Sequence, residues 1–452
     1  MKINFFKSVT FTVVLTVLVF SPSLNGQTPN VKEVEARILK QAGENIEKYR
    51  KGNASILFKT ADGKGISNAK VEIVQKTHDF LFGSVIFDLT GGSPAYREDV
   101  FKARFSKIFN LAVFPYYWSS YENQQGMANW QRMMPVIEWC RSQGITTKGH
   151  PLVWANRSGF PTWLNNYTPA QTEEFLKNRV INTVAGFKGK IDIWDVVNEP
   201  IHVQTWENAM KSAPRPSIPN VANYVEKALQ WANAADPSAT LIVNEYFTLA
   251  RERDRDRFDS LLKELDKRKA PFSDVGLQAH EPREEWFKPD YVWNVFDLYS
   301  KYGHRLHITE YTPQSSGKEI TGGWRKGTWT LDAQRDFAEQ FLRICFGHPA
   351  VVSFNWWGLS DRQIWLPGGG LIDEEYRPKP IYNTVDSLIN IEWKSKASVT
   401  SDKNGAVSFR GFYGNYDVTL TTSDGKVYIY PLHLRKDEEN EWVFVVNINK
   451  VK

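Results

Sequence analysis

IDIWDVVNEP, residues 191–200 of the 452-residue chain, has the pattern of a strand that is covered on both faces and ends on a carboxylate. Its apolar residues first alternate and then run together, as in the buried strands of parallel sheets. Pro200 ends the strand because it has no N–H to donate. A glutamate is rarely buried without a partner, so packing alone does not explain Glu199. In a parallel barrel, polar residues at the carboxyl ends of strands carry the chemistry.

A second stretch has the same form. Residues 305–313, RLHITEYTP, again describe a short strand that ends in a glutamate, Glu310, with a proline soon after. One such glutamate would be better explained as a solvated or arginine-paired strand end. Two in matched contexts, Glu199 and Glu310, favour the paired carboxylates of glycoside cleavage, where one protonates the leaving oxygen and the other attacks the sugar or holds a water.

Strand patterns alternate with helical patterns between about residues 79 and 393. This rhythm predicts an α/β fold, a (β/α)8 TIM barrel. An open, doubly wound sheet is the alternative, but no glycine-rich nucleotide loop follows the first strand. The expected strands are 80–86, 109–113, 146–154, 191–198, 241–246, 274–280, 305–312 and 351–357, and the clearest helical patterns are 130–143, 172–187, 221–233, 255–267 and 332–346.

The two flanks of the barrel differ from it in texture. Residues 27–78 begin with a helical pattern over 28–50 and continue with short strands around glycine turns, and residues 394–452 are rich in strands and turns. We expect the flanks to form one small accessory β-sandwich beside the barrel domain at 79–393. Alternatively, the N-terminal strands lead into the barrel and the tail folds alone.

Composition narrows the possible partners. The net charge is +5, the charges are interspersed, and no basic stripe argues for nucleic acid. Hydrophobic residues make up 42% of the chain, enough for a sizeable core. The 17 tryptophans offer faces that stack on sugars, although most aromatics fill cores. No cluster of Cys, His and Asp has metal-site spacing, and no cofactor is implied because two carboxylates suffice for the chemistry.

The N-terminus predicts export. Residues 1–26 combine two early lysines with a short apolar run and a small, polar end, as in a cleaved signal peptide. We therefore expect a periplasmic or secreted protein that no longer contacts the membrane after cleavage. Cys140 and Cys345 are the chain's two cysteines, and two buried free thiols are preferred over a disulfide. The sequence leaves the oligomeric state open.

Several motifs occur in a fixed order along the barrel segment. Together they resemble glycoside hydrolase family 10, the family of endo-β-1,4-xylanases, over roughly two-thirds of the chain. The family usually has Asp where Glu245 stands. The motifs are GHPLVW (149–154), WDVVNEP (194–200), NEY (244–246), GLQAH (276–280), ITE (308–310) and WGLSD (357–361) followed by Trp365.

The resemblance implies roles for individual residues. Glu199 would be the general acid/base and Glu310 the nucleophile of a retaining pair, which needs carboxyl groups about 5–5.5 Å apart. Asn198 would bond the sugar 2-OH, and His280 would orient Glu310. Further contacts with the substrate or the pair are implied for Gln278 near Glu199, His150 and Trp154 at the −1 sugar, Trp357 and Trp365 above it, and Tyr246 on the leaving-group side.

One motif departs from the family. Its second strand normally leads to Glu-Asn-x-Met-Lys-Trp, whose polar side chains grip the −2 xylose, whereas residues 110–118 here are NLAVFPYYW. A site that loses hydrogen-bonding groups loses discrimination. We expect Tyr116, Tyr117 or Trp118 to stack on the sugar or to block it. Ala155 also stands where the family usually has His.

These departures leave several substrates open. The principal expectation is a retaining hydrolase that cleaves xylan or a decorated xylan by double displacement. Another β-glycan or a short or aryl β-glycoside is the alternative within the same chemistry. A carbohydrate-binding barrel without catalysis is the alternative of a different class, and it predicts the loss of a carboxylate, although both are present.

Overall fold

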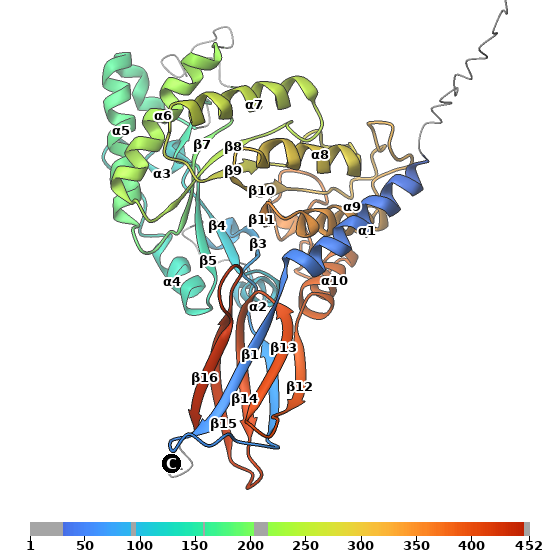
Figure 1. The fold of residues 1–452 in the computed structure, drawn as a ribbon. Helices are drawn as coiled ribbons and strands as arrows, with labels where there is room; N and C mark the ends of the chain where they lie inside the picture. Colours follow the sequence, from blue (N-terminus) through green and yellow to red (C-terminus); the bar gives the residue numbers. More distant parts are fainter. Residues whose placement is uncertain (1–29, 92–95, 157–158, 203–215, 447–452) are drawn as a thin grey trace, which may run out of the picture.

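The computed structural model describes residues 30–91, 96–156, 159–202 and 216–446 (Figure 1). The expected export signal at 1–26 lies outside these residues. Within them, no helix has the length and apolar character needed to cross a membrane. Cys140 and Cys345 are both buried free thiols, as the sequence favoured.

A closed parallel barrel forms the larger part of the molecule, which confirms the predicted TIM barrel (Figure 1). Neighbouring strands pair in chain order, and the last pairs with the first. The short β6 (Val153–Trp154) continues the position of β5 beside β7. The barrel strands are β3 (Leu81–Val85), β4 (Leu111–Pro115), β5 (Thr146–His150), β7 (Ile193–Asn198), β8 (Thr240–Glu245), β9 (Asp274–Leu277), β10 (Arg305–Tyr311) and β11 (Val351–Trp356).

Helices lie around the barrel between its strands (Figure 1). Local sequence explains where α5 begins, since Thr168 and Gln171 form a capping box and Pro169 takes the first helical position. The sequence patterns did not single out α2, α8 or α10. The helices are α2 (Glu98–Ile108), α3 (Trp118–Tyr121), α4 (Met134–Ser142), α5 (Pro169–Gly186), α6 (Ile218–Ala235), α7 (Glu252–Lys267), α8 (Pro289–Ser300), α9 (Leu331–Gly347) and α10 (Pro380–Ser387).

The two flanks meet in one β-sandwich. One sheet has the order β13-β1-β16 and the other β12-β2-β14-β15, so each combines N-terminal and C-terminal strands. Side chains between the sheets, such as Phe58, Ile73 and Val418, form a core separate from that of the barrel. The strands are β1 (Lys51–Thr60), β2 (Lys70–Gln75), β12 (Lys396–Thr400), β13 (Ala406–Phe412), β14 (Gly414–Thr421), β15 (Val427–Leu434) and β16 (Glu441–Val446).

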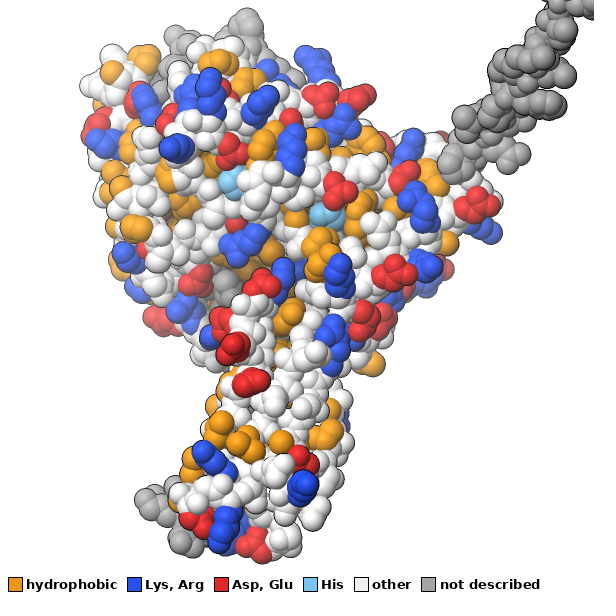
Figure 2. Space-filling view, in the orientation of Figure 1, with side chains coloured by type: hydrophobic (Ala, Val, Ile, Leu, Met, Phe, Trp, Pro, Cys, Tyr) orange, Lys and Arg blue, Asp and Glu red, His pale blue; other side chains and the backbone are white. Residues whose placement is uncertain are grey.

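The sandwich is joined to the barrel through α1 (Val31–Tyr49), which packs on α8 and α9. Gly347 of α9 allows the close approach, because a Cβ there would lie 2.5 Å from Ala42. Arg50 follows α1 and donates to the carbonyl oxygens of Phe346, His348 and Val351. The domain boundaries predicted at 78/79 and 393/394 stay predictions. Figure 2 shows the sandwich as a narrow projection from the barrel, with charged side chains of both signs intermixed on this face.

Candidate active site

The sequence-predicted site residues meet at the carboxyl ends of the barrel strands, with two exceptions, Tyr116 and Trp118. They line a cleft of about 490 Å³. Polar groups from strands far apart in the sequence therefore share one space, as the barrel topology requires. The predicted residues in the cleft are Tyr117, His150, Trp154, Asn198, Glu199, Tyr246, Gln278, His280, Glu310, Trp357 and Trp365.

The two glutamates sit differently in the backbone. Glu199 directly follows β7 and has a left-handed backbone, with φ of 56°, fixed by its N–H donating to Asn244 O at 2.8 Å. Such a conformation costs free energy in a non-glycine residue and is common at functional sites. Glu310 lies within β10 and is only 4% exposed. Since β8 and β9 separate β7 from β10, the two carboxyls approach the cleft from different sides.

A chain of side-chain amides connects the two carboxyls. Gln278 Nε2 donates to Glu199 Oε1 at 3.1 Å and to Asn198 Oδ1 at 3.2 Å. Asn244 Nδ2 donates to the same Asn198 Oδ1 and to Glu310 Oε1, both at 2.8 Å. Asn198 thus accepts twice within this chain of amides, and among the described residues its own Nδ2 has no partner. A network in which every member is bonded holds both carboxyls rigidly.

Burial and like charge shift the titration of both carboxyls. Burial and the nearby Glu245 raise the pKa of Glu199 to about 7, although hydrogen bonds from Gln278 and from Trp154 Nε1, at 2.8 Å, act against this rise. Burial and the charge of Glu199 raise the pKa of Glu310 well above its usual range. Because the charge of Glu199 is one cause of the raised pKa of Glu310, the two carboxyls titrate as a coupled pair, and a pair that holds one proton provides one acid and one carboxylate.

Two histidines face Glu310 from opposite sides. His150 Nε2 lies 3.8 Å from Glu310 Oε1, and its Nδ1 lies 2.8 Å from Asp195, which also pairs with Lys148 at 2.9 Å. His280 Nε2 lies 3.8 Å from Glu310 Oε2 and 2.8 Å from Gln278 Oε1. Burial lowers the pKa of His280 to about 3, so the ring is neutral. Because an amide oxygen only accepts, the single ring proton lies on Nε2, which donates to Gln278 Oε1.

Aromatic rings form the walls of the cleft. The Tyr117 ring lies 5.5 Å from His150 and 5.8 Å from Trp154, and Trp357 meets His150 at 4.8 Å. On the other side, Trp365 lies 4.9 Å from His280. These rings leave flat apolar surfaces around the carboxyls, which suit the faces of sugar rings.

The three aromatic residues that follow the second barrel strand, Tyr116, Tyr117 and Trp118, lie in three different environments. Tyr116 is buried against Trp194, with ring centroids 4.8 Å apart, and only Tyr117 of the three aromatics reaches the cleft. Trp118 is buried too, donates to Glu122 Oε2 at 2.8 Å and lines a different cavity. The expectation that Trp118 contacts substrate in the cleft is therefore not supported, because the first turn of α3 carries its side chain outward, towards α5.

Sequence reasoning missed several residues of the site. Asn244 stood in a quoted motif but received no role, although it is a buried amide at a strand end, as Asn198 is. Phe87 and Arg283 line the cleft from the loops that follow the first and sixth barrel strands. Arg283 lies 4.4 Å above the Trp365 ring. No group of His, Cys, Asp and Glu in the described parts of the chain is arranged to hold a metal ion.

Comparisons with known proteins place this geometry in a family. The model of glycosyl hydrolase family 10 matches residues 78–388. Endo-1,4-beta-xylanase 2 of Arabidopsis thaliana is 28% identical over 88% of this chain and 34% of its own length. Endo-1,4-beta-xylanase B of Thermotoga neapolitana is 27% identical over 62% of this chain and 80% of its own length.

One further relative is not named as a xylanase, and a solved xylanase structure shows similarity in fold alone. The anti-sigma-I factor RsgI6 of Acetivibrio thermocellus is 27% identical over 91% of this chain and 50% of its own length. The chain spans half or less of the first relatives it matches. Xylanase 10B from Thermotoga petrophila, solved with xylobiose, shares the fold with a TM-score of 0.58 and 24% identity, over 70% of this chain and 95% of that one. Because the family model covers well over half of its length, the protein belongs to glycosyl hydrolase family 10.

Proposed function

We propose that the protein is a retaining glycoside hydrolase that cleaves β-1,4-linked xylan or a decorated xylan by double displacement. The observation that carries the proposal is the pair of cleft carboxyls, Glu199 and Glu310, which are held by one amide chain but differ in surroundings. The names of the xylanase relatives support the substrate class.

In the first step, Glu199 gives its proton to the glycosidic oxygen while the Glu310 carboxylate bonds to the anomeric carbon and the C–O bond breaks. In the second step, Glu199 takes a proton from a water that attacks the same carbon and releases Glu310. A pKa near 7 suits Glu199 to both roles. Asn244 and the two histidines hold Glu310 in place, and Asn198 Nδ2 would bond the sugar 2-OH.

The walls would position the sugars on both sides of the cleaved bond. His150, Trp154 and Trp357 surround the −1 position, and Trp365 covers it. Tyr246 would meet the leaving group. Its ring is held in place by stacking on His202, with the ring centroids 3.9 Å apart. Tyr117 occupies the side where the family pattern has polar residues. Binding there would rest on stacking, so decorated or short substrates are favoured candidates beside plain xylan.

A panel of substrates tests this function. Purified protein and the Glu310→Ala variant are incubated with xylans, substituted xylans, other β-glycans and aryl β-glycosides, and products are identified with their anomeric configuration. Xylo-oligosaccharides of retained configuration, absent with the variant, are the expected result. Inverted products would overturn the double displacement, and activity on another glycan alone would move the specificity to the Tyr117 side.

A sugar-binding role without catalysis is the second candidate. It is favoured by the anti-sigma-I factor among the relatives, whose name is that of a regulator. Under this candidate, wild-type protein and Glu310→Gln would bind the same glycans and neither would release products. Turnover by the wild type on any member of the panel would exclude it.

We further propose that residues 1–26 direct export to the periplasm or the medium, on the basis of the sequence pattern. Mass spectrometry of protein from the native cell tests this. A mature N-terminus near Gln27 is expected, and an intact N-terminus in the cytoplasmic fraction would contradict the proposal.

A further inference from the structure

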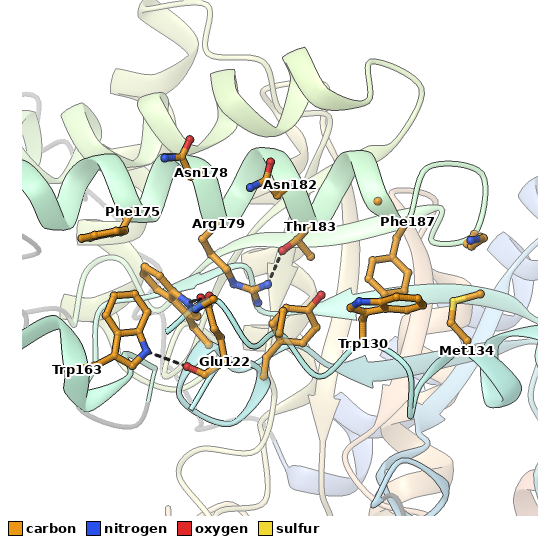
Figure 3. A pocket seen from close by; sticks show the side chains of 16 residues that line it. Glu122, Trp130, Met134, Trp163, Phe175, Asn178, Arg179, Asn182, Thr183 and Phe187 are labelled. Atoms are coloured by element: carbon orange, nitrogen blue, oxygen red, sulfur yellow. Dashed lines mark hydrogen bonds between the residues drawn. The ribbon is translucent and has the colours of Figure 1, made fainter. Parts of the chain in front are cut away.

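A second cavity of about 490 Å³ lies on the flank of the barrel, between α5 and the segment that joins β4 to α4 (Figure 3). One wall is a single face of α5, from Phe175 to Gly186, where the lining residues recur at helical spacing. The facing wall contains three tryptophans, Trp118, Trp130 and Trp163. We call this space the flank cavity.

Most inner polar groups of the flank cavity are already paired. Trp163 donates to Glu122 O at 3.0 Å, and the Glu122 carboxylate accepts from Trp118 and from Gly126 N at 2.7 Å. Arg179 points from α5 towards the aromatic wall, where it donates to Tyr116 O at 2.6 Å (Figure 3). The interior therefore offers ring faces to a ligand, together with polar groups that are bonded except for the buried Nε of Arg179, which has no partner among the described residues.

The rim carries the available polar groups. Asn178, Asn182 and Lys190 line the cavity and are exposed. Among the described residues, neither asparagine side chain has a hydrogen-bond partner. Each amide can donate twice and accept twice. Trp130, on the facing wall, is 46% exposed, which is unusual for so large an apolar ring.

Aromatic rings inside the cavity and amides on its rim indicate which kind of ligand would bind there. Flat aromatic rings match the C–H faces of sugar rings, and unpaired amides match their hydroxyls. Arg179 and Lys190 disfavour a cation, and Glu122, the one carboxylate in the lining, is already bonded. The volume lies within the range of small-ligand sites. Without a second carboxyl, the flank cavity can bind a glycan but cannot cleave it by the paired-carboxyl chemistry.

We infer that the flank cavity is a second glycan-binding site, which holds a segment of the same β-linked polysaccharide that the cleft acts on. This inference rests on the proposed function. Tyr117 lines the cleft and its neighbour Trp118 lines the flank cavity, so one polymer chain or particle can engage both regions. Tethering at the cavity raises the effective concentration of polymer at the cleft without changing the chemical step.

The test compares polymer with a short substrate. Trp130→Ala removes the exposed ring. Gly186→Gln adds a side chain at the cavity wall, where a Cβ would meet no atom within 4 Å. Gly43→Gln is the matched control, because Gly43 is also an exposed helical glycine with open space around it, but it lies on α1. Each variant is assayed on insoluble xylan and on an aryl β-xyloside.

Both cavity variants are expected to lose severalfold in activity on insoluble xylan and to keep wild-type rates on the aryl xyloside, whereas Gly43→Gln keeps both. Unchanged polymer activity in both cavity variants would overturn the inference. An equal loss on both substrates would overturn it too, since the effect would then act through the cleft.

Binding measurements separate this inference from the proposed function. Glu310→Gln protein is mixed with insoluble xylan, and the bound fraction is compared with that of Glu310→Gln/Trp130→Ala. Weaker retention of the double variant supports the flank cavity even where the wild type hydrolyses nothing. Equal retention overturns the flank cavity even where the wild type is an active xylanase.

Discussion

The cleft and the flank cavity enclose similar volumes, about 490 Å³ each, and both are lined by tryptophans, yet their polar groups are arranged in opposite ways. In the cleft, the carboxyls lie on strand ends and are bonded to other buried side chains. In the flank cavity, the amides stand exposed on a helix and have no such support. Rigid strands can hold a reactive pair in one geometry, whereas a helix face and loops suffice for stacking and adaptable hydrogen bonds.

The strongest test of this contrast is Glu310→Ala. We expect hydrolysis of every substrate to fall by on the order of 10⁴-fold or more, because the variant lacks the carboxylate that forms the covalent intermediate. Initial rates on xylan and on an aryl β-xyloside measure the effect. Asn182→Ala in the flank cavity is the control and should keep the aryl-xyloside rate. Residual rates within tenfold of wild type would show that Glu310 is not the nucleophile.

Glu199→Gln should separate the acid role from the nucleophilic one. We expect a loss of about 10²–10⁴-fold on xylan, whose leaving group needs a proton, and a much smaller loss in the first step on an aryl glycoside with an acidic phenol. Pre-steady-state release of the phenol reports that first step. Equal losses for both leaving groups would argue that Glu199 acts in another way.

The sequence predicted most of the buried carboxyl and amide groups of the cleft, but it did not predict the flank cavity. Glu199 and Glu310 could be found because a polar residue at the end of an apolar strand has few structural explanations, and strand order alone brings such ends together. Gln278 was identified only through the motif that resembles the family. Tyr117 and Trp118 are neighbours that face different cavities. Their directions depend on the turn into α3 and on the packing of α5, which no pattern in residues 110–118 specifies.

The same limit applies to the fold. The alternation of strands and helices predicted the barrel, and glycine turns in both flanks predicted a sandwich. The patterns did not single out β12, because its residues alternate between half-buried and exposed and lack the strong apolar signal of a core strand. Phe87 and Arg283 lie in the loops that follow β3 and β9, where no periodic pattern specifies which side chains enter the cleft.

Asp195 tests how far the cleft depends on buried charge. It is fully buried between Lys148 and His150, so Asp195→Ala should leave a buried, unpaired lysine and lower the free energy of unfolding by about 3–5 kcal/mol. Denaturant unfolding at pH 7 measures this. Asn53→Ala, on the exposed side of the sandwich, is a suitable control and should stay within about 0.5 kcal/mol of wild type.

The pKa of Asp195 predicts how the stability difference between wild type and Asp195→Ala changes with pH. Although burial opposes it, Lys148 and His150 lower the pKa of Asp195 below its usual value. A lowered pKa stabilises the fold at pH values above the pKa of the unfolded state, about 3.9, and this contribution is lost as the pH falls through the folded value. The difference between wild type and Asp195→Ala should therefore shrink in strong acid. A constant difference would mean that packing rather than charge carries the effect.

Glu245 should set the upper end of the pH profile. Glu199 must be protonated to act as an acid, so activity is present below its pKa of about 7 and is lost above it. Burial is the main cause of that raised pKa, and the charge of Glu245 is the second. Glu245→Gln removes the charge, so the alkaline limb of kcat/KM should move to lower pH.

The groups around Glu245 give this experiment its control. His202 Nδ1 lies 2.7 Å from Glu245 and its Nε2 lies 3.4 Å from Asp254, so the ring sits between two carboxylates. Asp254→Asn should move the alkaline limb less than Glu245→Gln, because Asp254 lies behind the ring. An unchanged profile in Glu245→Gln would show that the charge of Glu245 does not contribute to the raised pKa of Glu199.

The smallest expected change in kcat/KM comes from removing one tryptophan from each region, which compares the cleft directly with the flank cavity. Trp365 in the cleft is 41% exposed and Trp130 in the flank cavity is 46% exposed, so both can be removed at similar cost to the fold. Trp365→Ala should lose about 1 kcal/mol of stacking, about fivefold in kcat/KM, on an aryl xyloside and on xylan alike. Trp130→Ala should change the aryl-xyloside value by less than twofold. If the two variants gave the same pattern on both substrates, the two regions would act as one binding surface, and the separation drawn between a reactive cleft and a holding site would be wrong.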